Sequence, residues 1–328
     1  MSVDEFEFIR HLAKFASQSP QSLNLSDDGA ILAGDGQPWV LVKDMVQAGV
    51  HALADDDDGD IIAKAIRVNL SDLAAMGANP KFIMLGLCLG ANSQLSSLEH
   101  LAGVIRAECT QFGVGLIGGD TVRGQGPTTV SVTAIGQLSG NPILRSGAVA
   151  GDDLWVTGSI GDGALGLRML QQAEPAPQFA RLNKDDRQAL AKRYRLPTPR
   201  IALGEPLSGI ASAMIDVSDG LAADAAHMAR ASKVSITIDI EQVPVSQAFS
   251  HWVDAGVALA TKWTVLAGGD DYELLFSAPK LAAQDIHRIA RLTQCPITRI
   301  GTVNAGSGVV LHFDGQAVSL PVHGFTHF

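Results

Sequence analysis

Aspartates beside glycine, or at the ends of predicted strands and helices, are the residues of this chain whose type and spacing could do chemistry. They recur along the sequence as Asp27-Asp28-Gly29, Asp44, Asp72, Gly118-Gly119-Asp120, Asp216-Val217-Ser218-Asp219-Gly220 and Gly268-Gly269-Asp270-Asp271. Taken singly, each is more often turn chemistry or a helix N-cap than a ligand. Taken together, they favour a site of hard oxygen ligands, the set that suits Mg²⁺.

Three of these aspartates stand beside apolar segments. Asp44 follows a predicted strand, and Asp216 ends the apolar run of residues 213–215. Asp72 lies in an otherwise apolar helix three residues after Asn69, so both polar groups share one face. Burying a carboxylate is costly unless it is paired or bound to a metal, and few Lys or Arg residues stand nearby. We therefore expect these carboxylates to bind divalent cations.

A second motif lies at residues 161–166, which read G-D-G-A-L-G and match the G-x-G-x-x-G pattern of dinucleotide-binding folds. Such a fold needs a second strand about 20 residues further on that ends in an acid. Residues 175–186 are instead polar and contain Pro175 and Pro177. The motif is therefore interpreted as a tight turn into a helix, and an NAD-binding oxidoreductase is the less favoured alternative. The P-loop pattern and the protein-kinase H-R-D loop are absent from the sequence.

The elements that would position these residues form two α/β patterns, separated by a segment rich in Gly and Ala at residues 146–152. In the first pattern we predict helices at 2–16, 60–76 and 95–112, and strands at 39–42, 82–89, 114–117 and 129–138. In the second we predict strands at 154–157, 213–215, 234–240, 273–277 and 309–313, and helices at 162–172, 185–194, 218–231 and 281–292. We therefore predict an α/β (α+β) fold with two domains, residues 1–147 and 148–328.

Composition narrows the function classes. The length of 328 residues suits two domains. The net charge of −10 and the lack of clustered Lys and Arg argue against nucleic-acid binding. If the ligands are also anions, cations must screen them, because like charges about 4 Å apart repel by about 4 kcal/mol at an effective dielectric near 20. Three widely spaced cysteines, Cys88, Cys109 and Cys295, favour a reducing cytoplasm. The longest apolar run, residues 82–91, is too short to span a membrane.

Six strings resemble the thiamine-monophosphate kinase family in type, order and spacing, over nearly the whole chain. They occupy residues 27–30, 69–78, 118–121, 145–147, 215–221 and 268–274, and the string N-L-S-D-L-A-A-M-G-A is the most specific. The resemblance implies a fold like that of aminoimidazole ribonucleotide synthetase. An N-terminal mixed-sheet domain would bind ATP and Mg²⁺ and pair with its copy in a homodimer, and a C-terminal α/β domain would close over the nucleotide. The implied reaction converts ATP and thiamine monophosphate to ADP and thiamine diphosphate.

The same resemblance assigns roles to individual residues. The implied Mg²⁺ ligands are Asp28, Asp44, Asp72, Asp120, Asp216 and Asp219, and the implied ATP contacts are Gly119, Asp120, Arg145 and Ser218. The implied substrate-binding residues are His51, Asp270, Val322 and Phe325. The chain also departs from the family pattern: Val42-Lys43 replaces a Ser-Thr pair, Asp270 replaces a Glu, and Val322 stands where Trp is common, so that Phe325 is the remaining aromatic candidate there.

The expected chemistry needs no general base. A phosphate monoester has a second pKa near about 6 and is largely a dianion at neutral pH. We expect direct in-line transfer without a phosphoenzyme, in which positioning and cation screening lower the barrier. Two alternatives stay open: an enzyme of the same superfamily that acts on another small substrate, and a non-catalytic protein that binds Mg²⁺ and nucleotide.

Overall fold

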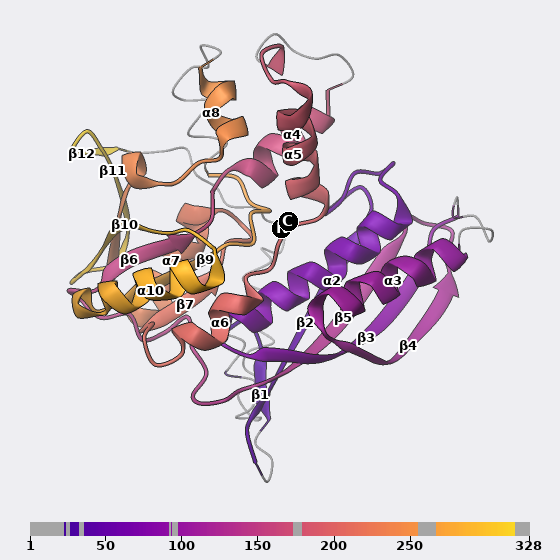
Figure 1. Cartoon of the computed structure of the whole chain (residues 1–328), viewed down its shortest axis with the longest axis horizontal. Coiled ribbons are helices and arrows are strands. Elements are labelled where there is room, and N and C mark those ends of the chain that lie inside the picture. Colours follow the sequence, from indigo (N-terminus) through magenta and orange to yellow (C-terminus); the bar gives the residue numbers. More distant parts are fainter. Residues whose placement is uncertain are drawn as a thin grey trace, which may run out of the picture.

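The computed structural model describes residue 23 and residues 27–32, 36–91, 93, 98–172, 179–254 and 267–318. They form two α/β domains side by side, each built on one sheet (Figure 1). The two-domain α/β architecture predicted from the sequence is confirmed. The helix predicted at 2–16 lies outside the described residues. Among the helices that are described, none is both long and apolar enough to cross a membrane.

The first domain contains a five-stranded sheet with the strand order β1-β2-β5-β3-β4. β5 pairs antiparallel with β2 and with β3, whereas β3 and β4 are parallel. The pattern does not predict β1, because three residues are too few to show a period. The strands are β1 (Ala30–Leu32), β2 (Trp39–Gln47), β3 (Asn79–Leu89), β4 (Gly115–Arg123) and β5 (Thr129–Gln137).

Helices α2 (Asp58–Ala75) and α3 (Leu98–Phe112) cover one face of this sheet (Figure 1). Val40, Val42 and Val46 of β2 are buried in the core beneath α2. Because side chains alternate along a strand, Asp44 points to the same face as these valines and Lys43 to the opposite face. Helix α2 begins before the predicted residue 60, since the Asp57 side chain caps it by accepting a hydrogen bond from the Gly59 N–H at 2.8 Å.

The second domain contains a seven-stranded sheet with the strand order β12-β11-β8-β10-β6-β9-β7. β10 was not expected, because a register shift between Arg299 and Gly301 breaks its period-two pattern. The pattern does not predict β12 either, because this strand, like β1, has only three residues. The strands are β6 (Asp153–Thr157), β7 (Ala213–Asp216), β8 (Ser235–Asp239), β9 (Leu274–Ala278), β10 (Ile297–Asn304), β11 (Gly308–Phe313) and β12 (Gln316–Val318).

Helices pack on both faces of the second sheet. On β6, Leu154 and Val156 join the core formed with α4 (Asp162–Leu170), α5 (Lys184–Arg195), α7 (Leu221–Ser232) and α8 (Gln247–Val253). Trp155 points the other way, toward α6 (Ile201–Leu207) and α10 (Ala283–Thr293). The sequence pattern does not predict α6 or α8, because each has only seven residues and α6 contains Pro206.

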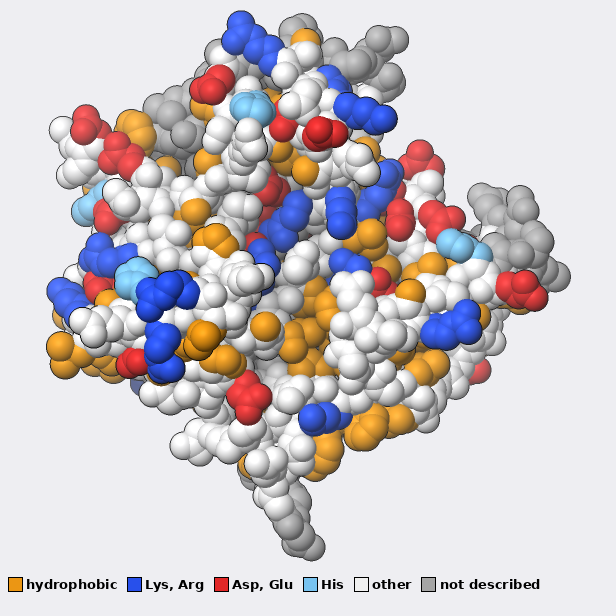
Figure 2. Space-filling model, viewed as in Figure 1, with side chains coloured by type: hydrophobic (Ala, Val, Ile, Leu, Met, Phe, Trp, Pro, Cys, Tyr) orange, Lys and Arg blue, Asp and Glu red, His pale blue; other side chains and the backbone are white. Residues whose placement is uncertain are grey.

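Helix α2 also contacts the second domain. Its last turn, with Ala74 and Ala75, is buried in the same core as α6 and α10. Arg67 pairs with Glu108 of α3 at 2.8 Å and donates to the carbonyl of Pro197 at 3.1 Å. On the face shown in Figure 2, Lys and Arg side chains gather where the two domains meet. Helix α2 is therefore the element shared by the two domains, and it carries residues 69–75 of the 69–78 motif.

Candidate active site

Carboxylates from both domains meet beside helix α2. Asp28 precedes β1, Asp72 lies on α2, and Asp216 is the last residue of β7; one carboxylate oxygen from each lies within 4.8 Å of the others. Asp44 belongs to the same group, because its charge raises the pKa of Asp72. The structure thus brings together four of the aspartates that the sequence singles out.

Hydrogen bonds from α2 hold two of these aspartates in place. The Asn69 side-chain oxygen accepts a hydrogen bond from the Asp44 backbone N–H at 2.8 Å, which fixes β2 against the helix. The Ser71 hydroxyl donates to the Asp216 carboxylate at 2.7 Å. The predicted shared face of Asn69 and Asp72 is therefore confirmed, since both meet the same strand residue.

The carboxylates repel one another, and those of Asp28, Asp72 and Asp216 are partly or fully buried. Burial, and next the charge of Asp28, raises the pKa of Asp44 and brings that of Asp216 to about 8. Burial raises the pKa of Asp72 well above its usual value, and Asp44 and Asp216 add to the rise. Burial and Asp28 likewise raise the pKa of Asp27 to about 7. The group carries more negative charge than the surrounding protein stabilises.

Arg145 supplies the nearest positive charge. Its Nε donates to Asp28 Oδ1 at 3.0 Å, its Nη2 contacts the same oxygen, and its backbone N–H donates to Asp27 Oδ2 at 3.1 Å. It lowers the pKa of Asp44, Asp72 and Asp216, but less than burial raises them. Asp28 Oδ2 is buried with no hydrogen-bond partner in the described part of the chain. An uncompensated group of hard oxygen donors fits a divalent cation such as Mg²⁺.

Asp219 belongs to a different group. Its carboxylate lies with Asp224 and His227, with one ligand atom from each within 4.8 Å of the others. Burial, and then the charges of Arg145 and Arg230, lowers the pKa of His227 to about 4, so the ring is neutral at pH 7. Sequence analysis did not single out Asp224 or His227.

The start of helix α7 differs from the simple capping interpretation. The N-cap position is Gly220, and no side chain from that position caps the helix. Instead, Asp224 Oδ2 accepts hydrogen bonds from the backbone N–H groups of Ser218, Asp219 and Gly220, each at 3.1 Å. This leaves the side chains of Ser218 and Asp219 to line a cavity.

Asp120 lies apart from the other acids within this single chain. In the strand register Asp120 of β4 pairs with Gly86, and Gly86 pairs with Ser131, so all three point away from α2. Asp120 is exposed on that open face of the first sheet. Its neighbour Gly119 faces the helix side, where a Cβ atom would come within 2.2 Å of the Leu85 carbonyl oxygen. The chain packs too closely there for any other residue.

Two of the residues assigned to the acceptor substrate, His51 and Asp270, line a cavity of about 1200 Å³ between the domains. His51, Asp270 and Tyr194 line it together with Asp44 and Ser218. The cavity therefore extends from the carboxylate group to the His51 and Asp270 side chains. Val322 and Phe325 lie outside the described residues.

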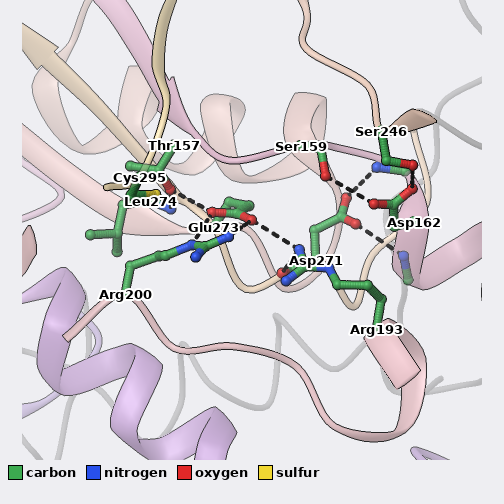
Figure 3. Close-up of polar contacts among 12 residues, drawn as sticks. Thr157, Ser159, Asp162, Arg193, Arg200, Ser246, Asp271, Glu273, Leu274 and Cys295 are labelled. Atoms are coloured by element: carbon green, nitrogen blue, oxygen red, sulfur yellow. Dashed lines mark hydrogen bonds and ion pairs between the residues drawn. The ribbon is translucent and has the colours of Figure 1, made fainter. Parts of the chain in front are cut away.

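The glycine-rich motif forms a turn that holds the Asp270 segment. Gly161, with φ +94°, is the N-cap of α4, so the interpretation as a tight turn into a helix is confirmed. The Gly161 and Gly163 N–H groups donate to the Asp271 carboxylate at 2.7 and 3.1 Å (Figure 3). A Cβ atom at Gly163 would lie 2.3 Å from the Asp270 carbonyl oxygen. These N–H groups bind a side chain of the protein and are not free to bind a phosphate.

A buried charge network holds Glu273, two residues after Asp271. Its fully buried carboxylate accepts hydrogen bonds from Thr157 at 2.6 Å, Arg200 Nε at 2.6 Å and Arg193 at 2.9 Å (Figure 3). Arg193 also donates to the Asp271 carbonyl at 2.9 Å. A buried carboxylate with this many charged partners fixes the segment at the start of β9.

Lys43 does not join the carboxylate group. Its ammonium donates to Ser131 Oγ at 2.6 Å and to Thr133 Oγ1 at 3.4 Å, both on β5. These contacts place it on the open face of the sheet, opposite Asp44. Lys43, which replaces a hydroxyl residue of the family pattern, therefore binds to the neighbouring strand β5.

Sequence reasoning missed several residues of the site. Ser71 and Lys64 lie on α2, and their polar side chains in an apolar helix were the available signal. Asp224 occupies the first turn of α7, where an acid is usual for helix-dipole reasons, so its sequence position gives no distinguishing signal. Arg193 and Glu273 are distant in sequence, and only the fold pairs them.

Comparison with known proteins supports the resemblance. Residues 26–138 match the family model for the N-terminal domain of AIR synthase related proteins, and residues 149–314 match the model for the C-terminal domain. The thiamine-monophosphate kinase of Salmonella typhimurium is 37% identical over 333 residues, covering 100% of this chain and 99% of the relative. The chain belongs to the thiamine-monophosphate kinase family.

Other thiamine-monophosphate kinases agree with this assignment. The enzyme of Caulobacter vibrioides is 36% identical over 327 residues, covering 98% of this chain and 90% of the relative. The solved structure of AaThiL complexed with AMPPCP and TMP is 30% identical, with a TM-score of 0.84, covering 99% of this chain and 97% of that one. The likeness to thiamine-monophosphate kinases thus extends over both domains.

Proposed function

We propose that this protein transfers the γ-phosphoryl group of ATP to thiamine monophosphate, giving ADP and thiamine diphosphate. One observation carries the proposal: carboxylate oxygens of Asp28, Asp72 and Asp216, drawn from both domains, lie within 4.8 Å of one another beside Arg145. Such a group suits a cation-bound polyphosphate. The names of the relatives, and a family structure complexed with AMPPCP and TMP, support the choice of the two substrates.

The acidic side chains would hold Mg²⁺. Asp28, Asp44, Asp72 and Asp216 are the proposed ligands of the main group, and Asp219 is the proposed ligand of a further ion. Bound Mg²⁺ would neutralise charge on the ATP phosphates and on the group in transfer. Arg145 is positioned to add to this effect, since its side chain is 25% exposed while it orients Asp28. Ser218 and Gly119 are the other proposed ATP contacts.

The acceptor end needs positioning more than proton transfer. The acceptor phosphate is largely a dianion at neutral pH, so an in-line approach to the γ-phosphorus needs no base. His51 and Asp270 are proposed to hold thiamine monophosphate, with Val322 and Phe325 as further candidates. The cavity of about 1200 Å³ has room for both substrates end to end.

We also propose that the chain forms a homodimer through the open face of the first sheet. Met45, Met84 and Val122 are exposed on this face, which no described helix covers. An exposed apolar face of a sheet favours association with a partner. Because Asp120 shares this face, it would reach an ATP site from a second copy.

Complementation tests both parts of the dimer proposal. Asp120→Asn and Asp72→Asn should each lose activity, and a mixture of the two after subunit exchange should regain it. The heterodimer would contain one site with both aspartates intact. Light scattering should show two copies for the parent, and Met84→Glu should give a monomer. No recovery in the mixture would place Asp120 outside the partner's site.

The decisive experiment for the activity is a product assay. The purified protein is incubated with ATP, Mg²⁺ and thiamine monophosphate, and thiamine diphosphate and ADP are separated by chromatography. EDTA should abolish both products. With γ-labelled ATP and no acceptor, no labelled protein should appear, because transfer is direct. Nucleotide binding without ADP formation would indicate a non-catalytic protein, and turnover only with aminoimidazole precursors would indicate another member of the superfamily.

The cytoplasmic location stays a prediction.

A further inference from the structure

Lys64 is a buried lysine directly behind the cavity. It lies on helix α2, is 1% exposed, and does not line the cavity. Burying an ammonium group costs several kcal/mol unless its charge is matched. A buried lysine is therefore expected to have neighbouring groups that balance its charge.

The ammonium group of Lys64 has three partners from three separate segments. It donates to the His51 carbonyl oxygen at 2.8 Å and pairs with Asp270 Oδ1 at 3.1 Å. It also lies 4.1 Å from the centre of the Tyr194 ring, an arrangement that stabilises a cation. His51 belongs to the first domain, whereas Tyr194 and Asp270 belong to the second. Lys64 therefore connects the two domains at the end of the cavity where His51 and Asp270 lie.

Asp270 needs this support because its backbone is unusual. Its φ of +70° is in the left-handed region, and that of Tyr272 is +51°. Residues other than glycine rarely adopt this backbone conformation unless the surrounding contacts impose it. The Asp270 N–H donates to the Ser218 carbonyl at 2.9 Å, and the Tyr272 hydroxyl donates to Asp270 Oδ1 at 3.2 Å.

The two carboxylate oxygens of Asp270 thus have different surroundings. Both Lys64 and Tyr272 contact Oδ1, whereas Oδ2 has no partner within the described residues. The side chain is 24% exposed where it lines the cavity. Lys64 also balances the charge of Asp270, which would otherwise repel an anionic substrate.

We propose that Lys64 is a positioning residue for the acceptor substrate: it holds the Asp270 carboxylate and the His51 turn in place without touching the substrate itself. The proposal rests on the proposed function, because it takes Asp270 and His51 to be the thiamine monophosphate contacts. Losing Lys64 should therefore weaken the use of thiamine monophosphate while ATP is used as before.

The test compares KM values for both substrates in the parent, Lys64→Met, Asp270→Asn, the double variant and the control Lys280→Met. Lys280 is exposed and outside the cavity. Lys64→Met should raise the thiamine monophosphate KM by about tenfold to a hundredfold, since small misplacements have effects of that size. The ATP KM should stay within about twofold, and the double variant should resemble Asp270→Asn, because coupled residues are not additive. Lys280→Met should behave as the parent.

Parent turnover separates the two claims, because a parent that forms no thiamine diphosphate refutes the proposed function itself. With an active parent, three results would overturn the role of Lys64: an unchanged thiamine monophosphate KM, equal losses for both substrates, or additive effects with Asp270→Asn. If Lys64→Met does not fold, Lys64→Arg replaces it, because it keeps the charge but cannot occupy the same position. A selective rise in the thiamine monophosphate KM then supports the proposal, and an unchanged KM overturns it.

Discussion

The Ser71 hydroxyl and the Asp216 carboxylate lie 2.7 Å apart, although 145 positions separate the two residues and they belong to different domains. This hydrogen bond fixes the end of β7 against helix α2 and lowers the pKa of Asp216, which burial raises. One residue further along the helix, Asp72 is held in the same carboxylate group. The geometry of that group therefore depends on how the two domains are docked.

Asp72→Asn should leave the fold intact and lower kcat by about a hundredfold or more, the size of effect seen when one charge-stabilising group is lost. Asparagine keeps the shape of the side chain but removes a negative charge, so the Mg²⁺ concentration needed for half-maximal activity should rise. Titrating Mg²⁺ in the product assay measures this change. Asp185→Asn, on the exposed side of α5, is the matched control. Normal turnover and normal Mg²⁺ dependence in Asp72→Asn would make the residue purely structural.

Stability without a metal should fall as pH rises. The pKa values of Asp27 and Asp216 are raised to about 7 and about 8, and those of Asp44 and Asp72 are raised as well. The folded state holds these protons more tightly than the unfolded state. Proton binding therefore stabilises the folded state fully below the pKa of the unfolded state, and this stabilisation is lost as pH rises through the pKa of the folded state.

Mg²⁺ should reverse this loss, because ligands release protons when a metal binds. The rise in melting temperature caused by Mg²⁺ should therefore be larger at about pH 8.5 than at about pH 5.5. The difference between Mg²⁺ and EDTA samples isolates the site from Asp271, whose pKa burial also raises to about 7. An equal Mg²⁺ effect at both pH values would contradict the assignment.

Gly163→Ala should disturb the Asp270 segment. The new Cβ atom would lie 2.3 Å from the Asp270 carbonyl oxygen, so the turn or the segment must move. We expect a loss of about 1–3 kcal/mol in the free energy of unfolding, typical of overpacking, together with a raised KM for thiamine monophosphate. Gly126→Ala, where a Cβ meets no atom within 4 Å, is the control. Urea unfolding and steady-state kinetics measure both effects; a stability equal to the control would show that the turn adapts without strain.

Lys43→Thr should preserve or improve the parent turnover, because the substituted side chain lies on the sheet face opposite the carboxylate group. The lysine contacts Ser131 and Thr133 on the open face of the sheet and points away from the carboxylates. Threonine is also closer to the hydroxyl pair typical of the family. Complete inactivation would show that the lysine has an essential role of its own, and light scattering would then test whether the dimer is lost.

The sequence predicted the two-domain fold and the convergence of Asp28, Asp44, Asp72 and Asp216, because strong apolar periods and specific motifs mark those regions. Prediction was weaker where local signals compete with distant contacts. The bulge in β10 breaks its alternation, and α6 and α8 are too short to show a helical period. Asp120 could not be placed from the sequence alone, since one residue of register decides which face of β4 it occupies.

Packing partners were the other limit. Lys64, Arg193 and Glu273 are ordinary charged residues in the sequence, and their buried pairs exist only once the chain has folded. The Gly161 turn matched a nucleotide-binding pattern, but its N–H groups bind Asp271. The glycines in this turn indicate that another part of the chain packs closely against them. Only the fold shows that this part is the Asp270–Asp271 segment.

Helix α2 holds both domains through Arg67, Ser71 and Lys64 as well as through its apolar last turn. The covalent connection at residues 146–152 is therefore not what keeps the halves together. A chain cleaved there by a protease should run as one particle on a sizing column, and two fragments expressed separately should reassemble into a working pair. Large hinge opening between the halves is correspondingly disfavoured, because it would break these contacts.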